Sequence, residues 1–194
     1  MEKEIENKLF ELLFIKSMRY NDVVRELNIP IQGVRKFYKD VSEERRDEID
    51  KIKRVRSLYN NKVYNNNKKK KNEFKFGDFK QFYEWYVNQE SIQNGSCYYC
   101  GSDEFKIRHL VEKKIFGDSK QMINRGRHLE IERKNSKNND YSPLNCVLAC
   151  YFCNNDKSDV ITEDDYFKYF VNEKPSSRKR YVDDKYSELL KKKK

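Results

Sequence analysis

The sequence predicts an α+β protein in which a small core of two strands and a helix follows a mainly helical N-terminal region. Two observations favour this fold class. Apolar residues recur at helical spacing through much of residues 3–59. Further along, a short run with alternating apolar residues at Leu129 and Ile131 and a second apolar run at Cys146–Ala149 flank a polar loop, and a helical pattern follows.

The N-terminal region begins with a predicted amphipathic helix over residues 3–16. Two shorter helices, 21–28 with Asn21 as its cap and 31–40, are separated by a break at Pro30. This outline is typical of a helix-turn-helix, and an ordinary three-helix bundle with a basic face explains it equally well. In a helix-turn-helix, the side chains that could face a DNA groove are Gln32, Arg35, Lys36 and Tyr38.

Composition divides the rest of the chain. A further helix is expected over residues 42–59 with Ser42 as its cap, and an aromatic-rich helix is expected to begin near Asp78. The Asn- and Lys-rich stretch between them has little to bury. The expected segments are a helix-turn-helix-like region at 1–59, a linker at 60–72, a core domain at 73–174 and a basic C-terminal tail, helical or disordered, at 175–194.

Four of the five cysteines stand in two Cys-x-x-Cys pairs, Cys97/Cys100 and Cys150/Cys153. Thiolates at this spacing can meet one ion from a turn, and four of them complete a closed tetrahedral site for structural Zn²⁺. No signal sequence or membrane-length apolar run is visible, so we expect a cytoplasmic protein with reduced thiols. Zinc is therefore favoured over disulfides, and Cys146 is expected to be a small buried residue.

The formal net charge is +10, from 42 Lys and Arg against 32 Asp and Glu. A cationic protein of this kind favours a polyanionic partner, of which nucleic acid is the commonest. The lysine runs at 68–71 and 191–194 contribute much of the excess, and a lysine-rich surface alone would account for them. Charge on its own therefore favours a nucleic-acid partner without identifying one.

Polar residues at the ends of the predicted core elements indicate a second, oxygen-rich site. Glu132, at the end of the first strand, and Asn154, on the following helix, offer the ligands that Mg²⁺ or Mn²⁺ prefers. A cation held there could neutralise charge that builds on a phosphate during hydrolysis. Arg133, beside Glu132, offers a planar donor fork for the same phosphate.

This combination of motifs resembles the HNH endonucleases, whose core is a ββα-metal (His-Me) finger, and is most similar to their arginine-containing branch. The likeness covers roughly half of the chain and does not reach the N-terminal helices. The residues that carry it are Cys97, Cys100, Leu129, Glu132, Arg133, Tyr141, Ser142, Pro143, Asn145, Cys150, Cys153, Asn154 and Lys157.

The resemblance implies a role for several of these positions. Glu132 and Asn154 would hold the catalytic Mg²⁺ or Mn²⁺, with Glu132 where the family usually has Asp. Arg133 stands where the family has its general-base histidine. Asn145 would brace the loop and the base, and Lys157 is expected to contact DNA.

Two residues compete for the role of general base. Tyr141 aligns with a tyrosine that starts strand cleavage in the arginine-containing branch, and the positive charges of Arg133 and the metal would favour its phenolate. His128 precedes Glu132 by four residues and, by strand alternation, would share its face. We favour Tyr141.

The sequence thus predicts a metal-dependent endonuclease acting on double-stranded DNA, with structural Zn²⁺ and catalytic Mg²⁺ or Mn²⁺. A type II restriction enzyme that cuts a palindrome as a homodimer is the expectation we favour. A homing or mobile-element nuclease is the nearest enzymatic alternative. A non-catalytic zinc-knuckle DNA-binding protein is the alternative from another class.

Overall fold

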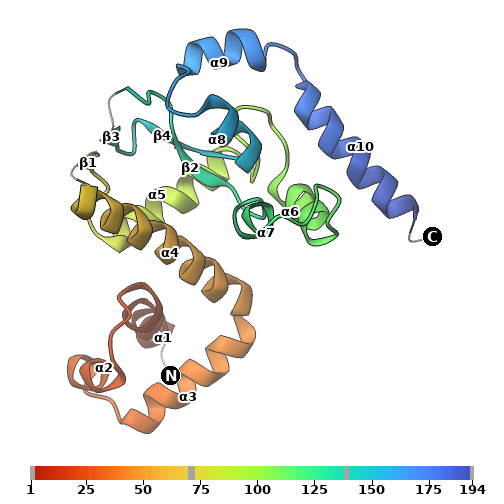
Figure 1. The fold of residues 1–194 in the computed structure, drawn as a ribbon. Coiled ribbons are helices and arrows are strands. Elements are labelled where there is room, and N and C mark those ends of the chain that lie inside the picture. Colours follow the sequence, from red (N-terminus) through yellow and green to blue (C-terminus); the bar gives the residue numbers. More distant parts are fainter. Residues whose placement is uncertain (1–2, 70–72, 138–139, 193–194) are drawn as a thin grey trace. The chain divides into compact units, whose positions relative to one another are not determined.

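A computed structural model describes residues 3–69, 73–137 and 140–192, and the chain forms two compact units (Figure 1). The first unit comprises Met1–Lys69 and Phe76–Tyr86, and the second comprises Lys70–Lys75 and Val87–Lys194. Among the described residues, no helix is both long enough and apolar enough to cross a membrane.

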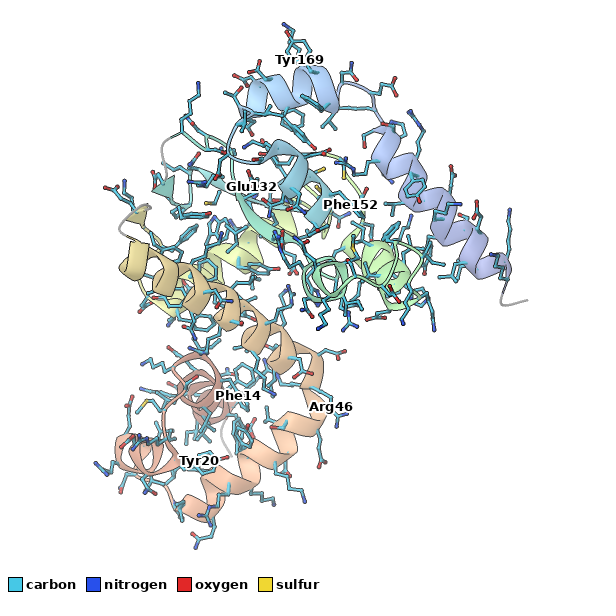
Figure 2. All side chains as sticks on the ribbon, in the orientation of Figure 1. Phe14, Tyr20, Arg46, Glu132, Phe152 and Tyr169 are labelled. Atoms are coloured by element: carbon cyan, nitrogen blue, oxygen red, sulfur yellow. The ribbon has the colours of Figure 1, made fainter. Side chains whose placement is uncertain are left out.

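The first unit is helical. Its helices pack around buried apolar residues that include Leu9, Val23, Val34 and Val55, and Figure 2 labels Phe14 and Tyr20 among its side chains. Its elements are α1 (Lys3–Phe10), the π-helical turn η1 (Glu11–Ile15), α2 (Tyr20–Leu27), α3 (Ile31–Glu44), α4 (Arg46–Lys69) and the first part of α5 (Phe79–Ile92).

The predicted pair of short helices with a tight turn is present as α2 and α3. Helix α2 begins at Tyr20, one residue before the expected cap at Asn21. Asn28 ends it in the left-handed conformation, with φ of 50°, which asparagine adopts more readily than most residues. Pro30 then holds extended backbone immediately before α3.

One expectation for the following segment is wrong, and one helix extends further than expected. Ser42 does not begin a helix but lies inside α3, where its hydroxyl donates to the Tyr38 carbonyl at 2.6 Å. The next helix, α4, starts at Arg46 and continues to Lys69, so most of the expected linker is helical. Asparagine and lysine do not break a helix, and α4 contains no glycine or proline. Residues 70–72 lie outside the described part of the chain.

The aromatic-rich helix is α5, and its start is capped as expected. The Asp78 side chain accepts from the Gln81 backbone N–H at 2.9 Å, and the Gln81 side chain accepts from the Asp78 N–H at 3.0 Å. This reciprocal pair is a capping box. Phe82 and Tyr86 have no exposed surface, so the aromatic face of α5 is core.

The second unit contains the predicted order of strand, loop, strand and helix. Strand β2 (Glu130–Arg133) pairs antiparallel with β4 (Cys146–Ala149), and α8 (Tyr151–Lys157) follows β4 directly. The loop contributes β3 (Asp140–Tyr141), which pairs in parallel with β1 (Glu73–Phe74). The remaining helices are α6 (Glu104–Glu112), α7 (Lys120–Arg125), α9 (Glu163–Phe170) and α10 (Ser177–Lys191).

The expected basic tail is a helix for most of its length. Helix α10 is capped by Ser176, whose hydroxyl accepts from the Lys179 N–H at 3.1 Å. Val182 is 1% exposed, and Asp183 accepts from Lys106 of α6 at 2.5 Å and from Lys179 at 2.6 Å. The lysine-rich composition of this segment gave no indication that Val182 and Asp183 would pack it against the rest of the second unit.

Candidate functional site

The four paired cysteines come together in the second unit. Their sulfur atoms all lie within 4.8 Å of one another, and the Sγ atoms of Cys100 and Cys150 are 3.8 Å apart. Zinc–sulfur bonds of about 2.3 Å in a tetrahedron separate the sulfurs by about 3.8 Å, so the spacing fits a four-thiolate zinc ion. All four side chains are buried and none forms a disulfide.

Local backbone structure sets up each half of this cluster. The Cys97 turn closes through Gly101, whose N–H donates to the Cys97 carbonyl at 2.9 Å and whose φ of 71° favours glycine. In the other half, Cys150 caps α8 and accepts from the Cys153 N–H at 3.5 Å. The cluster therefore joins the turn before α6 to the start of α8.

Crowding in the cluster also separates the thiol pKa values. Burial raises the pKa of Cys97, whereas hydrogen bonds with Cys150 and the other two thiols lower that of Cys100. Within the described residues, this is the one group of three or more His, Cys, Asp or Glu side chains close enough to hold a metal ion. Cys146 is buried on β4 and does not belong to it, in agreement with the sequence prediction.

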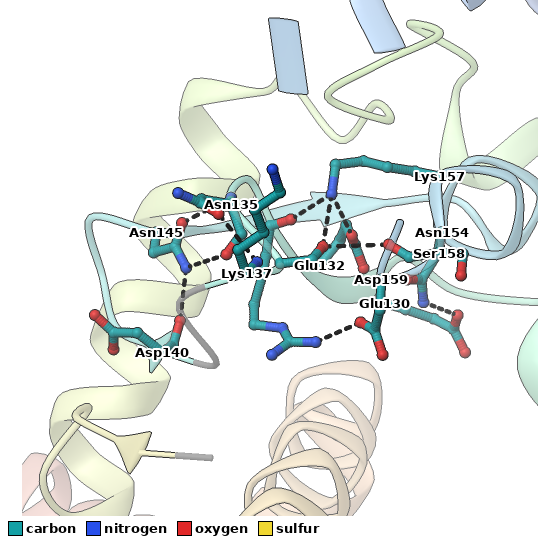
Figure 3. Close-up of polar contacts among 12 residues, drawn as sticks. Glu130, Glu132, Asn135, Lys137, Asp140, Asn145, Asn154, Lys157, Ser158 and Asp159 are labelled. Atoms are coloured by element: carbon teal, nitrogen blue, oxygen red, sulfur yellow. Dashed lines mark hydrogen bonds and ion pairs between the residues drawn. The ribbon is translucent and has the colours of Figure 1, made fainter. Parts of the chain in front are cut away.

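The second candidate site lies on the face of β2 that contacts α8 (Figure 3). Side chains two residues apart on a strand share a face, and both acidic residues of β2 reach α8. Glu132 accepts from Lys157 Nζ at 3.0 Å, and Glu130 accepts from Asn154 Nδ2 at 2.5 Å. The two expected metal ligands, Glu132 and Asn154, thus lie on facing elements, each bonded to a different partner.

Lys157 occupies a position that differs from the expected one. Its side chain has no exposed surface, and its ammonium donates to Glu132, to the Arg133 carbonyl at 2.9 Å and to Ser136 Oγ at 3.0 Å (Figure 3). An ammonium has three protons, and these oxygens account for all of them. The expectation that Lys157 contacts DNA is therefore wrong for this arrangement, because the group faces protein on every side.

Asn154 is part of a further chain of contacts. Its partner Glu130 also accepts two hydrogen bonds from Arg125 of α7, at 2.7 and 2.8 Å. Sequence reasoning missed Glu130, although the two-residue period of a strand places it beside Glu132. Oxygen donors from Glu130, Glu132 and Asn154 match the ligand type that Mg²⁺ prefers.

Arg133 and Tyr141 lie in contact. The Arg133 guanidinium lies over the Tyr141 ring, 4.9 Å from its centroid. Arg133 is 5% exposed and donates to Asp159, whose side chain is 79% exposed. Sequence alone gave no signal for Asp159, since it follows α8 in a loop without a motif.

Asn145 holds the loop between β2 and β4 together. Its side-chain oxygen accepts from the Asn135 N–H at 2.9 Å, and its amide donates to the carbonyls of Asn135 at 3.0 Å and Asp140 at 2.8 Å (Figure 3). Three hydrogen bonds from one side chain fix both ends of the polar loop. The loop-bracing role that the resemblance implies for Asn145 agrees with this geometry.

His128, the rival base, is held at the beginning of β2. Its Nδ1 lies 2.9 Å from Glu104 Oε1, and the other oxygen of Glu104 accepts from the Leu129 N–H at 3.1 Å. His128 lies two residues before β2, so strand alternation does not place it on the face of Glu132. Its contact with Glu104 fixes the entry of β2.

The expected DNA-contacting residues of the first unit divide into two kinds. Gln32, Arg35 and Lys36 are exposed on α3. Tyr38 is half-buried and stacks on Phe14, with ring centroids 5.1 Å apart. Its ring therefore contributes to the packing of the first unit, and its contact with DNA stays a prediction.

Comparison of the chain with family models, curated proteins and solved structures found no match in any of the three.

Proposed function

We propose that this protein is a metal-dependent endonuclease of the HNH, or ββα-metal, type that hydrolyses phosphodiester bonds in double-stranded DNA. The observation that carries the proposal is the unit of β2, loop, β4 and α8, which brings Glu132, Arg133, Asn145 and Asn154 to one small region. The net charge of +10 supports a polyanionic substrate.

In this proposal Glu132 and Asn154, with Glu130 beside them, would hold Mg²⁺ or Mn²⁺. The cation would supply charge neutralisation at the phosphate and at the leaving oxygen. Arg133 would bind a phosphate oxygen in place of Asp159, which is exposed and therefore readily displaced. Tyr141, under the Arg133 guanidinium, would take the proton from the attacking water.

A type II restriction enzyme is the biology we propose, with a homodimer cutting both strands of a palindromic site. The exposed side chains of Gln32, Arg35 and Lys36 on α3 are the proposed contacts to the target. A homing or mobile-element nuclease would use the same chemistry on a different target.

A second candidate is a non-catalytic zinc-knuckle DNA-binding protein. One observation favours it: the buried ammonium of Lys157 already neutralises Glu132. A carboxylate paired in this way must exchange its partner before it can bind a divalent cation.

Incubation of supercoiled plasmid with the purified full-length chain separates the candidates. We expect discrete fragments with Mg²⁺ or Mn²⁺, none with chelator, and a loss of at least about 100-fold in rate for Glu132→Gln and Asn154→Ala. Glu112→Gln, an exposed glutamate on α6, is the matched control and should cut normally. DNA binding without cutting in either metal would favour the non-catalytic candidate.

The same assay identifies the base. Tyr141→Phe removes only the hydroxyl, and we expect it to abolish cleavage while His128→Ala retains it. The opposite pattern would assign the proton transfer to His128.

A further inference from the structure

The four sulfurs of the cysteine cluster each have a different hydrogen-bonding neighbour. Cys97 Sγ accepts from the Cys150 N–H at 3.2 Å, Cys150 Sγ accepts from the Cys153 N–H, and Cys100 Sγ lies 3.2 Å from Ser102 Oγ. These three neighbours are neutral. The fourth sulfur, that of Cys153, accepts from a cation, Arg178 Nη1, at 3.0 Å.

Arg178 comes from the first turn of α10, far along the chain from either cysteine pair. The same guanidinium nitrogen also lies 3.2 Å from the Tyr166 hydroxyl, and Nη2 donates to Asp156 at 2.5 Å. Three partners therefore fix the plane of the guanidinium against the cluster. Burial by itself lowers the pKa of Arg178, but the charge on Cys153 and the hydrogen bond to Asp156 raise it overall.

A second contact ties the start of α10 to the other cysteine pair. The hydroxyl of Ser176, which is 5% exposed, donates to the Cys100 carbonyl at 2.8 Å. Ser176 and Arg178 are two residues apart, and they contact Cys100 and Cys153 respectively. The N-terminal end of α10 therefore bridges the two halves of the cluster.

The negative charge of a four-thiolate zinc site explains why the contact between Arg178 and Cys153 is favourable. Zinc bound by four thiolates carries a net charge of about −2 in a buried environment, where an uncompensated charge is costly. Hydrogen bonds from a charged donor are roughly twice as strong as those between neutral groups. A guanidinium on one thiolate offsets part of that charge more effectively than the amide and hydroxyl neighbours can.

We propose that Arg178 is an outer-sphere cation of the zinc centre, and that docking of α10 and retention of zinc are coupled through it. By thermodynamic linkage, a docked α10 raises the affinity for zinc, and bound zinc strengthens the docking of α10 by the same factor. This inference goes beyond the proposed nuclease function and does not depend on it, since it concerns only the structural metal.

The test is a zinc competition on the full-length protein with the chromogenic chelator 4-(2-pyridylazo)resorcinol. We expect Arg178→Met to weaken zinc binding by roughly tenfold or more, and Arg178→Lys to lose less because it keeps the charge. Arg180→Met is the matched control: Arg180 lies on the same helix, its side chain is 49% exposed, and it contacts Glu173 instead of the cluster. A zinc affinity in Arg178→Met equal to that of the wild type would overturn the proposal.

A spectroscopic reading separates a direct role from general loosening of α10. With Co²⁺ in place of zinc, loss of the donor on Cys153 should move the sulfur-to-cobalt charge-transfer bands to lower energy in Arg178→Met. Val182→Ala, which shortens a buried side chain of α10 but keeps the guanidinium, should leave the bands in place. Unshifted bands in Arg178→Met would assign any lost affinity to helix docking and reject the direct role.

The effect of zinc on the docking of α10 can be measured separately. Hydrogen exchange of residues 177–191 should be faster in zinc-free protein than in zinc-bound protein, and this difference should shrink in Arg178→Met. Equal protection of α10 with and without zinc in the wild type would contradict the coupling.

Discussion

The Lys157 ammonium and the Glu132 carboxylate form an ion pair that is almost completely removed from water, with side-chain exposures of 0% and 10%. Removal of one charge from such a pair takes away the attraction that offsets the burial of the other. We expect Lys157→Met to lower the free energy of unfolding by about 3 kcal/mol in urea titrations, because Glu132 loses the buried ammonium and the Arg133 carbonyl and Ser136 lose a donor.

The double variant Lys157→Met with Glu132→Gln tests the cause. Replacement of both charges should recover much of the loss, and the interaction energy follows from the double-mutant cycle. Lys168→Met, on the exposed side of α9, is a control that should change stability little. A loss below about 1 kcal/mol in the single variant would contradict the expectation that this ion pair stabilises the fold.

The roles of some residues could be predicted from the sequence around them, and the roles of others could not. The four cysteines were predictable because ligand spacing is local, and Asn145 because its motif was recognisable. The buried position of Lys157 was not predictable, since burial depends on which elements pack over a side chain. Arg178 had no signal at all, because its partners lie on other elements.

Helix α10 contacts α6 and α8 through charged side chains. Burial raises the pKa of Asp183, but hydrogen bonds from Lys106 and Lys179 lower it overall. A carboxyl whose pKa is lowered on folding stabilises the protein above its unfolded pKa of about 3.8, and that stabilisation is lost as pH falls through the lowered folded value.

Asp183→Asn should therefore destabilise the protein at pH 7, by no more than about 1 kcal/mol because all three side chains are 33% exposed. Urea titrations at several pH values check this, and the difference from wild type should disappear below the lowered pKa. A difference that persists at low pH would indicate a role in packing rather than in charge.

Strong periodic patterns predicted the elements well, and polar composition predicted them poorly. The strand–loop–strand–helix order and the capped start of α5 follow from local patterns and caps. The helical course of residues 60–69 was not predicted, because an asparagine- and lysine-rich composition alone does not distinguish a helix from a loop. The tail that contains α10 was expected to be either helical or disordered, and the structure shows the helix.

At the scale of the whole chain, loss of zinc should destabilise the second compact unit more than the first. All four cysteines belong to the second unit, so removal of zinc with 1,10-phenanthroline should speed hydrogen exchange in residues 87–194 and leave residues 3–63 largely protected. Cys146→Ala should still bind one zinc per chain, because Cys146 lies outside the cluster. An equal loss of protection in both units would contradict this assignment.

A metal bound by the cysteine cluster also cross-links two distant parts of the chain. A metal that joins Cys100 to Cys150, 50 positions apart, converts the intervening segment into a closed ring that contains α6, α7, β2, β3 and β4. Closing a ring of that length costs a free chain about 3–4 kcal/mol of entropy. Unlike a disulfide, this cross-link opens and closes without electron transfer, so the concentration of free zinc sets the fraction of chains in which the ring is closed while the four thiols stay reduced.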